Sequence, residues 1–202
     1  MKNKRNIKWL LLIVFAIAVM SGGGGCGGSG GDTPTPAPTP EERALELITP
    51  FYNLFRANLW EGGVRDFDEG FKNHNENWLS YDGNPPPFGD TVPRGIAETL
   101  GFLGGYMFVK IPDLHVEIIT VQVIDDWIFV RSELTGKFDY DLALFPGETE
   151  KNYFGLAVGD DEFSIMALDY HRFERINGEL KLVELYHTEN WGMAVLQSLG
   201  YI

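Results

Sequence analysis

The chain has 202 residues and a formal net charge of −13 at pH 7, with 29 acidic against 16 basic side chains. Phosphate backbones and anionic lipid surfaces repel a chain with this excess of negative charge, so nucleic acid is not an expected partner. The length leaves room for one domain of ordinary size with a single core.

The first 25 residues have the layout of a secretory signal, with a basic start, an apolar core and then small residues. The apolar run at 9–20 is shorter than the roughly 20 residues that a membrane-spanning helix needs. Cys26, the only cysteine, stands among glycines and resembles the acylated cysteine of bacterial lipoproteins. We expect an exported protein of the cell envelope with a lipid anchor on Cys26, and plain secretion after cleavage near 16–18 is the alternative.

Removal of residues 1–25 takes away four basic and no acidic side chains, which moves the formal charge from −13 to −17. Residues 26–40 are rich in glycine and then alternate threonine with proline, a composition that forms an extended tether rather than a core. Residues 41–202 are therefore the predicted globular domain. If Cys26 carries lipid, this domain has no thiol for a disulfide bond or for catalysis.

Helical signals come first in the domain. Thr39 is a predicted N-cap with Pro40 at the first helical position, and apolar spacing continues to residue 59 on a helix that is either continuous or kinked at Pro50. A short helix leading into a loop is expected over 64–80. A further helix begins near Ile96 and is expected to stop at Gly104-Gly105.

The apolar period then changes to two, which predicts antiparallel strands joined by short turns. Turns are expected at Asp125-Asp126 and at Asn177-Gly178, and Asn190 is expected to cap a last helix. The predicted strands cover 114–124, 127–142, 150–158, 162–176 and 179–187. Helices followed by a run of strands predict an α+β domain, with helices packed on one face of a curved sheet.

Asp169, His171 and Phe173 occupy alternate positions of the strand predicted at 162–176, so they point to the same side. A carboxylate and an imidazole beside an aromatic ring are able to line a pocket. They also suit a sheet edge, as a hydrogen-bonded pair or in cross-strand pairs with residues such as Glu184 or Tyr186.

Six segments occur in the order typical of SnoaL-like polyketide cyclases, also called ester cyclases, and the chain resembles that family. They are FKNHNE, PRGIAETLGFL, IPDLHVEI, DDWIFVRSELTGKF, DYHRFERINGELKLVELYH and LQSLG. The resemblance implies the fold of the nuclear-transport-factor-2-like superfamily, a cone-shaped, curved, mixed or antiparallel sheet with N-terminal helices closing a deep apolar pocket.

The same resemblance implies acid–base catalysis of a ring closure without metal or cofactor. Asp169 is the family's proton-transferring residue in this alignment, and His171 is the alternative match. His74 corresponds to a loop histidine that donates a hydrogen bond to the substrate, with Asn73 or Asn75 beside it.

Phe173 and Tyr186 complete the implied substrate-binding set. At Gly136-Lys137-Phe138 the chain departs from the family's Gly-Thr-His, which leaves the substrate open. His115 and His187 are expected at a rim or in structural positions. The four histidines form no i, i+4 pair, so no metal site is expected.

Two functions follow as hypotheses. The first is a cofactor-independent cyclase, isomerase or hydrolase that acts on a small hydrophobic carbonyl compound. The second is a non-catalytic module of the cell envelope that binds a small hydrophobic molecule or a partner protein. Formation of a homodimer through an open sheet face is left open.

Overall fold

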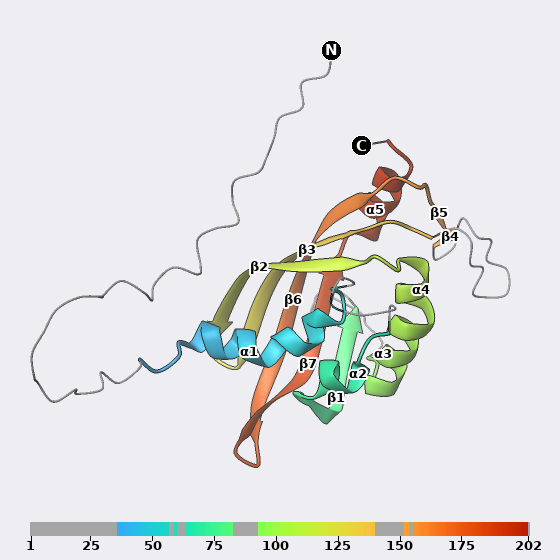
Figure 1. Cartoon of the computed structure of the whole chain (residues 1–202). Coiled ribbons are helices and arrows are strands. Elements are labelled where there is room, and N and C mark those ends of the chain that lie inside the picture. Colours follow the sequence, from blue (N-terminus) through green and yellow to red (C-terminus); the bar gives the residue numbers. More distant parts are fainter. Residues whose placement is uncertain are drawn as a thin grey trace, which may run out of the picture. The chain divides into compact units, whose positions relative to one another are not determined.

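The computed structural model of the protein is shown in Figure 1, and it describes residues 36–56, 59, 64–82, 93–139, 152–153 and 156–201. The predicted signal of residues 1–25, Cys26 and the tether as far as residue 35 lie outside the described residues. No helix among the described residues is long and apolar enough to cross a membrane. Ala37–Ile202 form one compact unit.

The first helix, α1 (Pro40–Asn53), begins as the sequence predicts. The Thr39 hydroxyl accepts from the Glu42 amide at 3.1 Å, and the Glu42 carboxylate accepts from the Thr39 amide at 2.7 Å. This reciprocal pair satisfies two amides that the first helical turn leaves free. The helix runs through Pro50 without a break and ends at Asn53, which brings Tyr52 into its last turn.

The main sheet has five strands in the order β1-β7-β6-β3-β2. The two predicted hairpins are confirmed, because β2 pairs with β3 and β6 pairs with β7, both antiparallel. β1 lies parallel to β7, so the sheet is mixed. The strands are β1 (His74–Asp82), β2 (His115–Ile124), β3 (Trp127–Gly136), β6 (Phe163–Ile176) and β7 (Glu179–Glu189).

Two local predictions are wrong. The segment expected as a loop after the short helix α2 (Phe67–Phe71) is the edge strand β1, which the polar run at residues 72–77 disguised. The helix α3 (Ile96–Phe102) does not stop at the two glycines either. It continues through the π-helical turn η3 (Leu103–Met107) into α4 (Phe108–Lys110), because the apolar side chains around the glycines are buried against the sheet.

The remaining elements lie at one end of the sheet. The single strand predicted at 150–158 is a separate two-stranded ribbon of β4 (Asn152–Tyr153) and β5 (Leu156–Ala157). The last helix, α5 (Trp191–Ser198), begins after Asn190, whose side chain accepts from the Met193 amide at 3.1 Å as expected for an N-cap. This helix lies beside β6 (Figure 1).

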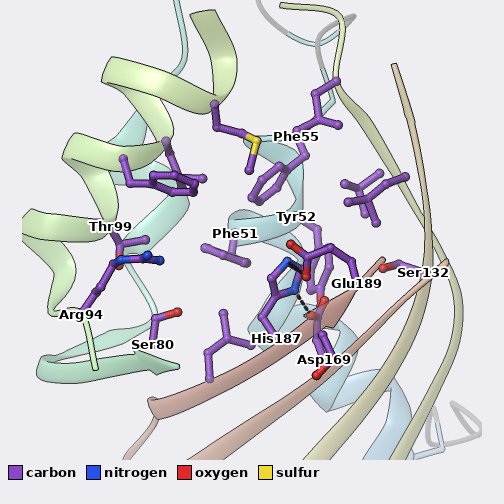
Figure 2. A pocket seen from close by; sticks show the side chains of 18 of the residues that line it. Phe51, Tyr52, Phe55, Ser80, Arg94, Thr99, Ser132, Asp169, His187 and Glu189 are labelled. Atoms are coloured by element: carbon purple, nitrogen blue, oxygen red, sulfur yellow. Dashed lines mark hydrogen bonds and ion pairs between the residues drawn. The ribbon is translucent and has the colours of Figure 1, made fainter. Parts of the chain in front are cut away.

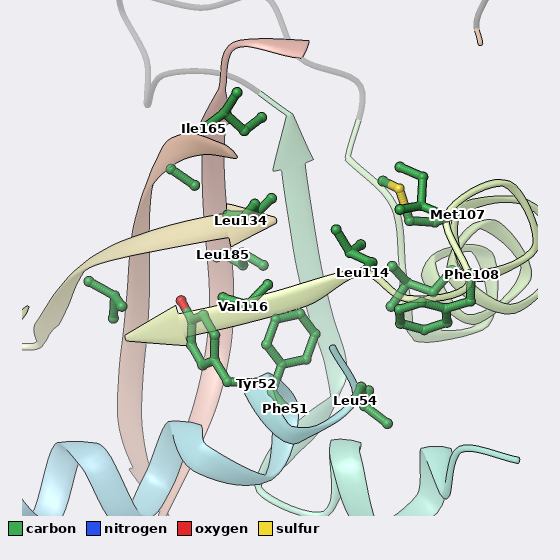
Figure 3. Close-up of a cluster of buried hydrophobic side chains, with 14 of the residues drawn as sticks. Phe51, Tyr52, Leu54, Met107, Phe108, Leu114, Val116, Leu134, Ile165 and Leu185 are labelled. Atoms are coloured by element: carbon green, nitrogen blue, oxygen red, sulfur yellow. The ribbon is translucent and has the colours of Figure 1, made fainter. Parts of the chain in front are cut away.

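One face of the sheet is covered by helices, and the core lies between them. In Figure 1, α1 crosses this face and the α3–α4 helical run stands beside β1. Burial alternates along β6, where Phe163, Ile165, Ala167, Asp169 and His171 point inward and the residues between them point outward. Figure 3 shows that apolar side chains of α1, η3 and α4 meet those of the sheet in this layer. The predicted α+β fold is confirmed.

The hairpin of β6 and β7 contains a β-bulge that sets the position of every later pair. Beyond the turn the strands pair regularly as far as Phe173 with Leu182, but the next pair is Arg172 with Glu184. Val183 is therefore an extra residue on β7. As a consequence, Asp169 faces His187.

Candidate functional site

A cavity of about 270 Å³ lies between the inner face of the sheet, the end of α1 and the α3–η3 helical run. Apolar side chains make up most of its wall, and Figure 2 shows the polar groups that interrupt them. The lining residues are Phe51, Tyr52, Phe55, Ser80, Arg94, Thr99, Phe102, Leu103, Met107, Leu114, Val116, Ser132, Leu134, Asp169, Leu185, His187, Thr188, Glu189 and Trp191.

Three charged side chains form a hydrogen-bonded chain on one wall of this cavity. The Nδ1 atom of His187 bonds the Oδ1 atom of Asp169, and the Nε2 atom of His187 lies 2.6 Å from the Oε2 atom of Glu189. The other carboxylate oxygen of Glu189 accepts from the indole of Trp191. The imidazole is thus held at both nitrogens by carboxylates, which we call the acid–imidazole chain of Asp169, His187 and Glu189.

Asp169 also accepts a hydrogen bond on the side away from His187. It is 4% exposed, and its Oδ2 atom accepts the hydroxyl proton of Tyr52, which reaches it from the last turn of α1. The same hydroxyl oxygen lies 3.0 Å from the Nε2 atom of His171. Because the single Tyr52 proton goes to Asp169, His171 donates from Nε2 to the tyrosine oxygen. Both oxygens of Asp169 are therefore engaged inside the protein.

The pKa shifts make this chain ionic at neutral pH. Burial alone would lower the pKa of His187, but the charges of Glu189 and Asp169 raise it well above its ordinary value. Burial would raise the pKa of Asp169, yet the charge and hydrogen bond of His187, with smaller contributions from His171 and Tyr52, lower it. His187 is therefore an imidazolium and Asp169 a carboxylate.

The two neighbours of Asp169 stay neutral. Burial, and then the charge of Asp169, raise the pKa of Tyr52 well above 10, so the phenol keeps its proton. Burial lowers the pKa of His171 to about 4. Among these four groups, only Asp169 and His187 carry charge at pH 7.

The opposite wall of the cavity is built by Ser80, Arg94 and Thr99 (Figure 2). Ser80 and Arg94 are joined by two backbone hydrogen bonds of 2.8 Å, which tie the segment before α3 to the edge strand β1. The guanidinium carbon of Arg94 lies 4.9 Å from the centre of the Phe102 ring. The cavity thus has a negatively charged carboxylate pair around His187 at one side and a cation at the other.

Solved structures with the same architecture place this arrangement among known folds. AclR, a proposed hydroxylase from Streptomyces galilaeus, matches with a TM-score of 0.54 and 16% identity, over 80% of this chain and 87% of AclR. A proposed SnoaL-like polyketide cyclase from Jannaschia sp. matches with a TM-score of 0.54 and 16% identity, over 81% of this chain and 97% of its own. The fold is that of the SnoaL-like polyketide cyclases.

A third solved structure that matches this chain holds a small molecule. It is a protein from Catenulispora acidiphila described as having a ketosteroid isomerase-like fold, in complex with trimethylamine, with a TM-score of 0.50 and 13% identity over 76% of this chain and 92% of that protein. No protein-family model and no curated protein sequence matches the chain. The resemblance expected from the sequence is confirmed at the level of the fold.

Within the SnoaL-like fold, two of the three predicted catalytic residues lie behind the cavity wall. Asp169 lines the cavity, but His171 is fully buried behind Tyr52. His74 starts β1 and packs among Phe51, Phe71 and Trp78, with ring centres 4.7–5.4 Å away. Burial, and then the charge of His171, lower the pKa of His74 to about 3. His74 is therefore a neutral member of an aromatic cluster.

The four predicted substrate-binding residues are not among the residues that line the cavity. The Asn73 amide donates to the Leu47 carbonyl at 2.8 Å, and the Asn75 side chain accepts from a nearby backbone amide on the surface. Phe173 is partly buried against the core. Tyr186 points to the outer face, where its ring stacks on Tyr81 at 4.6 Å.

The sequence predicts His187 at a rim or in a structural position and does not single out Glu189, whereas both residues line the cavity. A signal was present, because Leu185, His187 and Glu189 alternate along β7 and so share its inner face. The bulge at Val183 has no such signal in the sequence, yet it decides which residue of β7 faces Asp169. Without it, the simple hairpin register pairs Asp169 with Tyr186.

Within the part of the chain that the structure describes, no group of three or more His, Cys, Asp and Glu side chains is arranged to hold a metal ion. In the acid–imidazole chain, each nitrogen of His187 contacts a carboxylate. Because His187 and Glu189 also line the cavity, the proton between them lies where a ligand can exchange it.

Proposed function

We propose that this protein binds a small, largely apolar carbonyl compound in the cavity and moves a proton on it by acid–base chemistry that needs no cofactor. The observation that carries the proposal is the acid–imidazole chain of Asp169, His187 and Glu189 in the wall of an otherwise apolar cavity. Perturbed ionisable groups in such a cavity are typical of catalytic sites.

The geometry divides the work between the three residues. Both oxygens of Asp169 accept hydrogen bonds from within the protein, so Asp169 orients and charges the imidazole. His187 keeps 26% of its side chain exposed and lines the cavity, so its Nε2 proton is the one that a ligand oxygen can reach. Glu189 shares that proton in the absence of a ligand and is the base beside it.

In this scheme a ligand carbonyl oxygen takes the hydrogen bond from Nε2 of His187, and Glu189 removes a proton from the adjacent carbon. The imidazolium stabilises the charge that develops on the oxygen, and the apolar wall strengthens that interaction by excluding water. Return of the proton to another atom gives an isomerisation, and attack of the carbanion on a second carbonyl gives a ring closure. Both outcomes need only these side chains.

Exchange of a carbon-bound proton for deuterium tests this directly. A panel of small aromatic and aliphatic ketones in heavy water, followed by proton NMR, should show exchange beside the carbonyl with the unmodified protein. Glu189→Gln and His187→Gln should lose it, while Glu117→Gln, an exposed acid on β2, should keep it. Ketones that bind without exchange would contradict catalysis.

The alternative is a binding module without catalysis. It is favoured by the engagement of both Asp169 oxygens and of Glu189 by protein donors, which a purely structural charge cluster would also show. Under this alternative, native mass spectrometry should detect a bound apolar molecule, and Glu189→Gln should leave its binding unchanged.

We also propose that the protein is exported and held at the cell envelope by lipid on Cys26, with residues 26–40 as the tether. The basic, apolar and small-residue order of residues 1–25 supports this proposal. Incorporation of labelled palmitate into the unmodified chain and its loss in Cys26→Ser would be the expected result. Release of both proteins into the medium would favour plain secretion.

A homodimer is proposed on the outer face of the sheet. Met166 and Leu168 on β6 are 41% and 45% exposed, and Phe129 packs edge-on against Tyr170 beside them. Apolar side chains gathered on one sheet face support contact with a second copy of the chain.

A further inference from the structure

Three residues that line the cavity have a buried hydroxyl group with no hydrogen-bond partner among the described residues. They are Ser132 on β3, which is fully buried, Thr99 on α3, which is 7% exposed, and Thr188 on β7, which is half-buried. Thr188 pairs with Leu168, which faces outward, whereas Ser132 and Thr99 lie on opposite walls of the cavity (Figure 2). A buried hydroxyl without a partner costs stability, and native structures nearly always satisfy such groups.

Ser132 is placed beside the acid–imidazole chain by the register of the sheet. Ser132 pairs with Ala167, and Ala167 pairs with Glu189, so the three residues form one row across β3, β6 and β7. Val130, Asp169 and His187 form the neighbouring inward row. Only the short side chain of Ala167 separates the hydroxyl from Glu189 along the row. In Figure 2, the Ser132 oxygen points toward Glu189 and Asp169.

Thr99 stands on the opposite wall. It lies in the middle of α3 next to Arg94, across the cavity from Asp169 and Ser132 (Figure 2). Between the two walls the lining is apolar and includes Phe51, Phe55 and Leu185. The cavity is therefore polar at its two sides and apolar in the middle.

We infer that the ligand carries an oxygen function at each end of an apolar body. One oxygen is bound by the Ser132 hydroxyl beside His187 and Glu189, and the other by the Thr99 hydroxyl beside Arg94. This inference rests on the proposed function, because it names the class of molecule that the proposed site takes. Ser132 is a positioning residue for the reacting oxygen, and Thr99 selects ligands by the oxygen at the far end.

A second argument concerns stability in the absence of a ligand. If these hydroxyls were structural, their removal would break hydrogen bonds and lower the melting temperature. Since neither has a protein partner, Ser132→Ala and Thr99→Val should leave the melting temperature of the free protein unchanged or raise it. Loss of ligand affinity without loss of stability then separates a binding role from a structural one.

The experiment uses three fluorescent probes of one shape, which are naphthalene, a naphthol, and a naphthalenediol with its hydroxyls on opposite rings. With the unmodified protein, affinity should rise along this series. Ser132→Ala and Thr99→Val should each weaken binding of the diol by about tenfold, the usual effect of one lost hydrogen bond, and leave naphthalene unaffected. Ser164→Ala is the control, because Ser164 is exposed on the outer side of β6.

The outcomes separate this inference from the function on which it rests. If naphthalene and its derivatives all bind equally to the unmodified protein, the two-oxygen ligand is wrong while the cavity remains a binding site. A fall in melting temperature with either variant would also overturn the inference, since the hydroxyl would then be structural. If none of the three probes binds, the proposed function fails as well.

Discussion

At the scale of single residues, the site depends on how charge is compensated around one imidazole. Asp169 and Glu189 flank His187. On its other side, Asp169 accepts a hydrogen bond from the neutral phenol of Tyr52, which in turn contacts the neutral imidazole of His171. A buried carboxylate without such partners would take up a proton, because burial penalises its charged form. The cluster therefore keeps an ion pair in a place from which most water is excluded.

The pKa of His187 should fall when one of the flanking acids is neutralised. Glu189→Gln removes the charge that raises this pKa most, so we expect the pKa of His187 to decrease toward its ordinary value. NMR titration of the histidine ring protons measures it. Glu184→Gln is the matched control on the same strand, since Glu184 pairs with Arg172 on the outer face. An unchanged titration in Glu189→Gln would show that the two groups do not interact.

His74 should make the protein sensitive to acid. Its pKa is lowered to about 3 in the folded state from 6.5, so below pH 6.5 the unfolded chain takes up a proton that the folded chain refuses. Stability therefore falls as the pH decreases from 6.5 toward 3. His74→Leu should remove this loss, which amounts to roughly 3 kcal/mol at pH 4.

Urea unfolding of His74→Leu and of the unmodified chain at pH 7 and pH 4 measures this effect. The difference between the two proteins should shift in favour of the variant at the lower pH. An equal difference at both values would show that His74 is protonated in the folded state.

At the scale of elements, the bulge in the β6–β7 hairpin matters most. The hairpin turns at Asn177-Gly178, where both residues have positive φ values of 51° and 90°. From such a tight turn the register can be counted residue by residue, and the count holds as far as Phe173 with Leu182. Val183 then shifts every later pair by one, which brings His187 opposite Asp169.

The turn is the element whose stability can be tested most simply. Gly178→Ala should lower the free energy of unfolding by about 1–2 kcal/mol, because an L side chain at φ of 90° is strained. Gly101→Ala is the matched control. Gly101 lies inside α3 with open space around it, so alanine there should stabilise the protein by about 0.5–1 kcal/mol.

Chemical denaturation of both glycine variants compares them with the unmodified chain. Equal effects of the two substitutions would contradict the assignment of the turn.

At the scale of the whole molecule, the two faces of the sheet differ in what covers them, since helices pack on only one of them. The inner face holds the core and the cavity under α1 and the α3–α4 helical run, and the outer face carries exposed apolar side chains on β6. This separation leaves the outer face available for contact with a second copy while the cavity stays accessible to a ligand.

Leu168→Lys tests the proposed homodimer. Leu168 is 45% exposed on the outer face, so a lysine there should not disturb the core but should place like charges opposite each other in a symmetric contact. Light scattering after size-exclusion chromatography should show a dimer for the unmodified protein and a monomer for the variant. A monomer in both cases would refute the dimer.

Features that depend only on neighbours along the chain could be predicted from the amino-acid sequence. The cap at Thr39, the two hairpin turns, the cap at Asn190 and the shared side of Asp169 and His171 all follow from local hydrogen bonding and from the period of two in a strand. These features were predictable because each rests on a few consecutive residues.

The contacts between distant side chains could not be predicted in this way, because they depend on how the helices and strands pack together. The chain of contacts from Tyr52 through Asp169 to His187 joins residues 117 and 18 positions apart, and the second distance depends on one extra residue in β7. His74 and His171 are buried in the core because helices α1 and α2 supply Phe51 and Phe71 beside His74, and α1 supplies Tyr52 beside His171. Several side chains have local sequence patterns that are equally compatible with a place in the site. Which of them make contact depends on the packing of segments that are distant in the sequence, and the periodicity of one strand or helix carries no information about that packing.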